Sequence, residues 1–173
     1  MTDSERRAEL ARSWNPHLLE QENHWIYDDG GRSEAGYKGY TGDCVTRAIA
    51  IAAELPYQSV YDALNAEAKI NPIRTRGPVK RIHRSSARTG VFRKHHDQFL
   101  KNLGWIWTPT MSIGSGCQVH LLREELPSGR LICKVSKHLV AVIDGVIHDT
   151  HDYSRDGTRC VYGFYSLPET LHV

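Results

Sequence analysis

The sequence predicts an α+β fold, in which helices come first along the chain and an antiparallel sheet follows. Apolar residues at helical spacing dominate the first two thirds of the chain, and segments rich in Val, Ile and Tyr fill the last third. Strands and helices do not alternate as they do in parallel-sheet proteins. A length of 173 residues with 40% hydrophobic and 24% charged residues suits one globular domain.

The N-terminal part is polar. Residues 3–13 predict a short polar helix, and residues 25–40, rich in Gly, Asp and Tyr, predict an irregular approach to the core. We therefore expect an N-terminal extension over residues 1–24 and one domain over residues 25–173. No signal-like apolar core follows the N-terminus, and no apolar run approaches the about 20 residues of a membrane span. We expect a cytoplasmic protein with no membrane partner.

The first helix of the domain is expected from the apolar spacing over residues 45–53. Thr41 and Asp43 lie just ahead of it and are of the types that cap helices. Cys44 is then in the first helical turn.

Further helices are predicted over residues 56–68, where a proline opens the first turn, and over residues 91–103. Residues 71–89 carry Pro and Gly and predict a long loop. A short helix is expected over residues 118–126. Strands are predicted over residues 105–108, 130–136, 138–143, 146–150 and 159–165.

Asp144-Gly145 predicts a two-residue hairpin turn, because both residue types tolerate positive φ. In that register Ile143 pairs with Val146, and His138 and Asp149 become diagonal neighbours on one face. The Asp149 carboxylate could then orient the His138 imidazole and stabilise its charged form. The alternative is that His138 only ends a strand and Asp149 only starts a turn.

Cys44 is a candidate nucleophile. The positive end of a helix stabilises a thiolate and lowers its pKa, and a nucleophilic cysteine needs a base with an orienting group. The alternative is a small buried hydrophobic residue, which is the usual role of a free cysteine.

Two segments, GDCVTRAIA (residues 42–50) and HLVAVIDGVIHDT (residues 138–150), resemble the papain-like cysteine peptidase superfamily. The chain is most similar to its compact bacterial and phage branch, which includes peptidases that trim bacteriocin leaders. The resemblance implies a papain-like fold, with N-terminal helices packed on a C-terminal antiparallel sheet and a peptide or protein substrate in the groove between them. It implies Cys44 as nucleophile, His138 as general base and acid, and Asp149 as orienting group. Hydrolysis of a peptide or isopeptide bond would proceed through a thioester.

The oxyanion site departs from that family. Papain-like enzymes usually carry a glutamine about six residues before the cysteine, and this chain has Lys38 there. The backbone N–H of Cys44 and the Lys38 side chain are the candidate donors to an oxyanion. Val45 follows the cysteine, where an aromatic residue would indicate a close relative of papain.

Residues 74–95 hold eight of the 22 Lys and Arg residues and no acid, which leaves 14 basic against 20 acidic residues elsewhere. This basic segment indicates an acidic protein partner or a nucleic acid. Only Phe92 could stack on a base, and a solvated loop is the simpler interpretation. A catalytically silent papain-like scaffold that binds a partner through this segment is the alternative to an enzyme. The candidate contact residues are Arg74, Arg76, Lys80, Arg81, Arg84 and Arg88.

The remaining chemistry-bearing residues predict no further site. The four cysteines have no CxxC spacing, so we expect reduced thiols rather than disulfides. The histidines are not spaced as metal ligands, so we expect neither a metal nor a cofactor.

Overall fold

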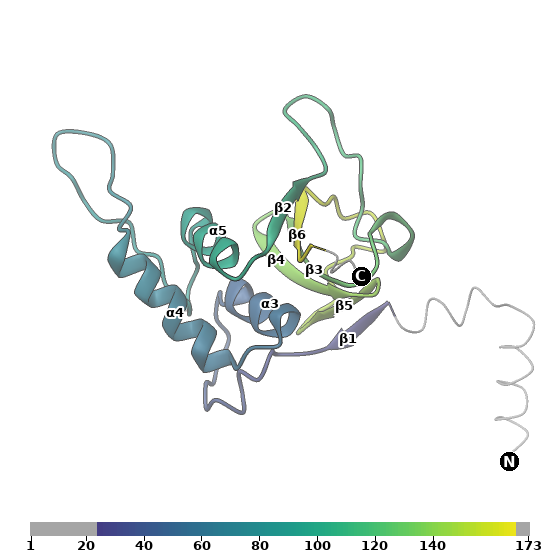
Figure 1. Ribbon diagram of the computed structural model, residues 1–173, viewed down its shortest axis with the longest axis horizontal. Helices are drawn as coiled ribbons and strands as arrows, with labels where there is room; N and C mark the ends of the chain where they lie inside the picture. Colours follow the sequence, from purple (N-terminus) through teal and green to yellow (C-terminus); the bar gives the residue numbers. More distant parts are fainter. Residues whose placement is uncertain (1–23, 169–173) are drawn as a thin grey trace, which may run out of the picture.

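The structure, a computed structural model, describes residues 24–168 (Figure 1). Over these residues three α-helices lie on one side of a six-stranded sheet, which confirms the α+β class. No helix in this part of the chain combines the length and apolar character needed to cross a bilayer. The helix expected over residues 3–13, and nearly all of the expected extension, lie outside the described residues.

The helices are α3 (Cys44–Ala53), α4 (Tyr57–Ile70) and α5 (Arg93–Asn102). Helix α3 lies between α4 and the sheet, where it contacts β4 (Figure 1). All its residues from Val45 to Ala52 are buried, because both of its sides are covered. Its alanines keep it thin enough for this position.

The sheet has the strand order β1-β5-β4-β3-β6-β2. Its strands are β1 (Trp25–Tyr27), β2 (Ile106–Pro109), β3 (Arg130–Val135), β4 (His138–Ile143), β5 (Val146–Asp149) and β6 (Gly163–Ser166). The central strands β3 and β4 are buried on both faces, which explains their nearly continuous apolar runs.

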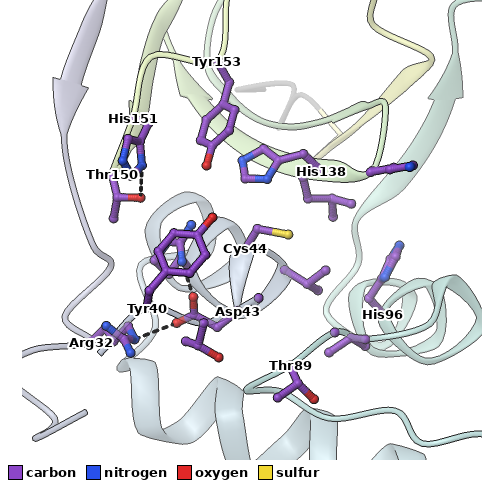
Figure 2. A pocket seen from close by; sticks show the side chains of 18 of the residues that line it. Arg32, Tyr40, Asp43, Cys44, Thr89, His96, His138, Thr150, His151 and Tyr153 are labelled. Atoms are coloured by element: carbon purple, nitrogen blue, oxygen red, sulfur yellow. Dashed lines mark hydrogen bonds and ion pairs between the residues drawn. The ribbon is translucent and has the colours of Figure 1, made fainter. Parts of the chain in front are cut away.

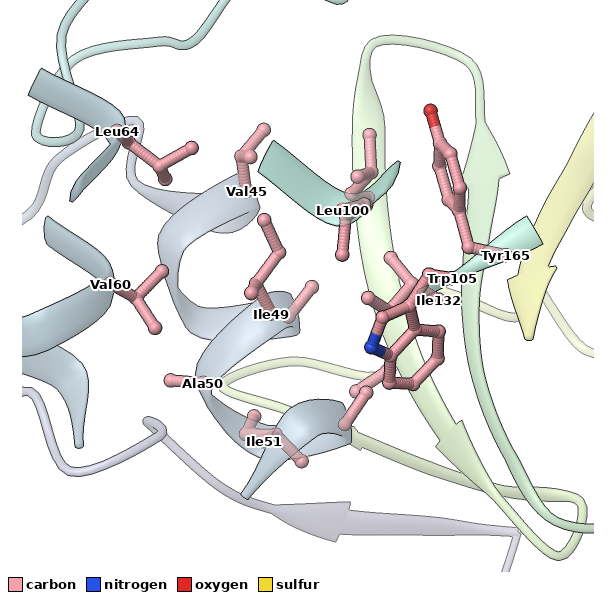
Figure 3. Packing of buried hydrophobic residues seen from close by; sticks show 14 of the residues in the cluster. Val45, Ile49, Ala50, Ile51, Val60, Leu64, Leu100, Trp105, Ile132 and Tyr165 are labelled. Carbon is pink, nitrogen blue, oxygen red and sulfur yellow. The ribbon is translucent and has the colours of Figure 1, made fainter. Parts of the chain in front are cut away.

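Apolar clusters cover both faces of the sheet. Between the helices and the sheet, Ile49, Leu64, Leu100 and Ile132 are fully buried (Figure 3). On the opposite face a second cluster contains Leu131, Cys133, Val140, Val142 and Val161. Together they hold β4 rigidly beside the N-terminus of α3.

The predicted hairpin is confirmed. Asp144 and Gly145 adopt φ of 49° and 79°, and Ile143 pairs with Val146 in the expected register. The Asp144 carboxylate accepts a hydrogen bond from the Gly129 N–H at 2.8 Å, which holds the turn against the preceding loop.

The sheet is mixed rather than wholly antiparallel. Strand β1 comes from the segment expected to be irregular and pairs with β5 in parallel. It has only three residues, too few to show an alternation pattern in the sequence, and its partner lies about 120 positions away.

The expected helix over residues 118–126 is wrong except for a 3₁₀ turn at Arg123–Glu125. The chain around Val119 and Leu121 is extended instead, with backbone hydrogen bonds to Val161 and Arg159. This pairing also occupies the start of the predicted strand 159–165, so that β6 begins only at Gly163.

The expectation of reduced thiols is wrong for two of the four cysteines. Cys117 and Cys160 form a disulfide, with their Cα atoms 5.8 Å apart. The pairing of the two extended segments brings them together, which their separation of 43 residues in the sequence does not reveal. Cys44 and Cys133 are free thiols.

Candidate functional site

Three residues predicted as a catalytic set lie together. Cys44 is the first residue of α3, His138 begins β4 and Asp149 ends β5. Nε2 of His138 lies 2.7 Å from Oδ2 of Asp149, and both side chains are buried. The remaining ring nitrogen, Nδ1, is available to the Cys44 thiol, which interacts favourably with the ring, and Figure 2 shows the two side chains next to each other. The hairpin register therefore places the imidazole as the sequence predicts.

The electrostatics of the pair favour a thiolate and an imidazolium. Burial by itself raises the pKa of Cys44, but the interactions with His138, the Leu139 backbone and the charge of Arg47 together bring the pKa below its ordinary value of 9.0. Burial likewise lowers the pKa of His138, but hydrogen bonds with Asp149 and Cys44 raise it above 6.5 overall. Both shifts favour transfer of a proton from sulfur to the ring.

Asp149 is held by several donors. Its Oδ1 atom accepts hydrogen bonds from Nη2 of Arg47 at 3.1 Å and from the Thr150 N–H at 2.7 Å. Nε1 of Trp25, in β1, donates to the Asp149 carbonyl oxygen at 3.1 Å. The carboxylate is thereby fixed in one orientation toward His138.

Arg47 joins Asp149 to a second buried carboxylate. Its Nη1 atom donates to Asp43, which also receives the Tyr57 hydroxyl at 2.6 Å and pairs with Nε of Arg32 at 3.0 Å. The Asp43 and Arg47 side chains are almost fully buried. Two acids, Asp43 and Asp149, and two bases, Arg47 and the partly exposed Arg32, thus form a charge-balanced network behind Cys44.

The predicted capping roles of Thr41 and Asp43 are wrong. Asp43 stands at the N-cap position of α3, but its side chain forms no capping hydrogen bond because it is engaged by Arg47. The Thr41 hydroxyl donates instead to the Arg88 carbonyl oxygen. Beside it, a Cβ atom on Gly42 would lie 3.0 Å from the Thr89 carbonyl oxygen, so glycine permits this close approach.

An aromatic ring covers the imidazole. Tyr153 stacks on His138 with ring centroids 3.8 Å apart and an interplanar angle of 30°. Figure 2 shows the tyrosine above the thiol, on the side where His151 lies. This ring shields one face of His138 from solvent.

The thiol opens into a pocket of about 730 Å³ between the start of α3, β4 and α5 (Figure 2). This volume is in the usual range for ligand sites, about 300–1,000 Å³. Residues outside the predicted set also line it, among them Tyr40, Thr89, Phe92, His96, Lys134 and Tyr153.

The two predicted oxyanion donors differ in position. Cys44 is the first residue of α3, so its backbone N–H has no partner within the helix and lies beside the thiol. Lys38 is exposed and does not line the pocket, and its carbonyl oxygen accepts a hydrogen bond from Arg32 at 3.2 Å. The backbone N–H of Cys44 therefore lies at the site, and the Lys38 side chain does not.

The candidate contact residues of the basic segment lie apart from this pocket, whereas the end of the segment, residues 89–93, lines it. Its loop projects beside the end of α4 (Figure 1), and backbone hydrogen bonds such as His83 N–H to the Ile73 carbonyl fold it back on itself. All six predicted contact residues are exposed, none lines the pocket, and none forms an ion pair within residues 24–168: Arg74, Arg76, Lys80, Arg81, Arg84 and Arg88.

Sequence reasoning missed most of the support around the thiol. The spacing of Asp43 and Arg47, four residues apart on one helix, is a signal that could have revealed their ion pair. No pattern indicated that Tyr153 stacks on His138, or that His96 and Lys134 line the same pocket. Within the described part of the chain, no cluster of His, Cys, Asp and Glu could hold a metal ion.

Comparison of the chain with protein-family models, with curated protein sequences and with solved structures finds no match.

Proposed function

We propose that this protein catalyses cysteine-dependent acyl transfer, in which a peptide or isopeptide bond is hydrolysed through a thioester on Cys44. One observation carries the proposal: a thiol at a helix N-terminus lies beside an imidazole that a buried carboxylate orients. A nucleophile, a base and an orienting group at hydrogen-bonding distance are what this chemistry needs. The α+β arrangement and the order of Cys, His and Asp along the chain support a papain-like fold.

The reaction has two steps. The Cys44 thiolate attacks the scissile carbonyl carbon and forms a C–S bond, and the His138 imidazolium gives its proton to the departing amine as the C–N bond breaks. In the second step neutral His138 takes a proton from water, which attacks the thioester carbon. The C–S bond breaks, and the products are a carboxylic acid and the regenerated thiolate.

The surrounding residues support these steps without reacting. Asp149 stabilises the imidazolium and orients its ring, and Arg47 holds the carboxylate in place. The backbone N–H of Cys44 is placed to donate to the developing oxyanion.

The alternative proposal is a papain-like scaffold that binds an acidic protein or a nucleic acid through the basic segment. It is supported by the exposed cations over residues 74–88, none of which lines the pocket. In that case Cys44 would have the reactivity of an ordinary thiol.

The test is the pH dependence of iodoacetamide labelling at Cys44, resolved by mass spectrometry. Fast labelling below neutral pH is expected, because an ordinary thiol with a pKa of about 8.5 is almost wholly protonated there. His138→Ala should remove it. His151→Ala is the matched control, because His151 also lines the pocket but is not bonded to Asp149. Cys133, fully buried, should stay unlabelled in the folded protein.

Labelling at the rate of an ordinary thiol, unchanged by His138→Ala, would exclude the enzyme proposal and favour the scaffold. Binding of a nucleic acid that weakens steeply with salt would then support the basic segment as the contact surface.

A further inference from the structure

Positive charge without a counter-ion gathers at the pocket. Lys134 of β3 and Lys137 of the following turn both line it, and neither ammonium group forms an ion pair within residues 24–168. Of the described residues that line the pocket, one is an acid, Asp43, and it is already engaged by Arg47 and Arg32. The free charge facing the pocket is therefore positive.

Lys134 is the unusual member of this set. It is half-buried on the central strand β3, and no acid lies beside it among residues 24–168 to form an ion pair. It lies opposite Leu139 in the β3–β4 register, one residue beyond His138. Burial lowers its pKa, and the nearby charge of Cys44 acts in the opposite sense, so the two groups interact electrostatically.

His96 adds a neutral imidazole to the pocket, and its Nδ1 atom is a donor when that nitrogen carries the proton. Burial lowers its pKa to about 4, so the ring is uncharged at neutral pH. Its Nδ1 atom is buried and has no hydrogen-bond partner among the described residues. Figure 2 shows the Cys44 side chain directed from α3 toward the side of the pocket where His96 projects from α5. A buried polar atom without a partner calls for an explanation, and a ligand at this position supplies one.

We infer that this part of the pocket binds a carboxylate of the substrate, with the Lys134 ammonium supplying the charge and His96 a hydrogen bond. The inference rests on the proposed function, because the carboxylate would belong to the peptide whose scissile carbonyl lies at Cys44. Two sources share this chemistry: an acidic side chain next to the scissile bond, and the C-terminal carboxylate of a chain.

The inference is tested with two alkylating reagents of nearly equal size, anionic iodoacetate and neutral iodoacetamide. Both need the thiolate, so the ratio of their rates at Cys44 cancels any change in its ionisation. Lys134→Met should lower the ratio of iodoacetate to iodoacetamide by about five-fold, the effect of one charge across a partly screened pocket. Lys101→Met is the control, because Lys101 is exposed on α5 and does not line the pocket.

The outcomes separate the two proposals. If both reagents label wild-type Cys44 no faster than an ordinary thiol, the proposed function fails. If Cys44 is activated but the ratio is the same in wild type and in Lys134→Met, the carboxylate site is overturned. Lys134→Gln is the second variant should Lys134→Met not fold, and protection of Cys133 from labelling reports folding in each protein.

Peptides distinguish the two carboxylate sources by protecting Cys44 from iodoacetamide. One peptide carries an internal glutamate and an amidated C-terminus, and the other carries glutamine there and a free C-terminus. Protection by the first alone assigns an acidic side chain, and protection by the second alone assigns a chain terminus. Whichever peptide protects Cys44, the Lys134→Met substitution should abolish that protection. Protection by neither peptide overturns the inference.

Discussion

Replacement of Arg47 by methionine tests the buried network behind the thiol. The side chains of Arg47, Asp43 and Asp149 are 8%, 0% and 4% exposed, and methionine preserves much of the arginine's volume without its charge. Removing one partner of a buried ion pair costs about 3–5 kcal/mol, because it leaves a charge without compensation. Here each carboxylate keeps other partners: Tyr57 and Arg32 for Asp43, and Thr150 for Asp149. We therefore expect Arg47→Met to lower the free energy of unfolding by about 3 kcal/mol, the lower end of this range.

Urea unfolding followed by circular dichroism measures this loss, which should appear as a lower midpoint with an unchanged slope. The midpoint of thermal unfolding should fall by about 6–12 °C, since each kcal/mol lowers it by about 2–4 °C in a chain of this size. Arg130→Met is the control, because its partner Glu54 is 70% exposed and such surface pairs contribute about 0–1 kcal/mol. If Arg47→Met is no more destabilising than Arg130→Met, the two carboxylates do not depend on Arg47 and the reasoning is wrong.

Three further predictions concern the pair, the sheet and the disulfide. Asp149→Asn should lower the pKa of His138 and raise that of Cys44, so that iodoacetamide labelling requires higher pH. Asp152→Asn is the control and should leave the pH dependence of labelling unchanged, because Asp152 pairs with His24 and not with His138. Gly163→Ala should lower the free energy of unfolding in urea by about 1–3 kcal/mol through overpacking, since its Cβ atom would clash with the Trp107 ring; equal stability would show that the ring can move. Reduction of the Cys117–Cys160 disulfide should lower stability by about 2–4 kcal/mol, and a Cys117→Ser variant should lose this sensitivity to reductant.

Local patterns accounted for the parts of the fold that depend on near neighbours. Apolar spacing indicated α3, and Asp144-Gly145 predicted a hairpin whose register then followed from the two-residue periodicity of strands. That register placed His138 beside Asp149, and Cys44 opened the helix as predicted. These features needed only chain geometry over about a dozen residues.

Long-range pairing escaped the same reasoning. Strand β1 joins β5 in parallel, and the segment around Leu121 pairs with the chain near Arg159 rather than forming a helix. A short segment has similar local preferences in either setting, so the partner that tertiary contact supplies decides its conformation. The disulfide follows from that pairing and was missed with it.

The sequence by itself therefore determined the α+β class and the Cys44, His138 and Asp149 positions, because helical and strand periodicity are set by neighbouring residues. Only the tertiary structure decided what surrounds them: Arg47 behind the carboxylate, Tyr153 over the imidazole, and Lys134 and His96 in the pocket, with Lys38 outside it. Burial and charge neutralisation depend on side chains brought together from distant positions, and no local pattern encodes them.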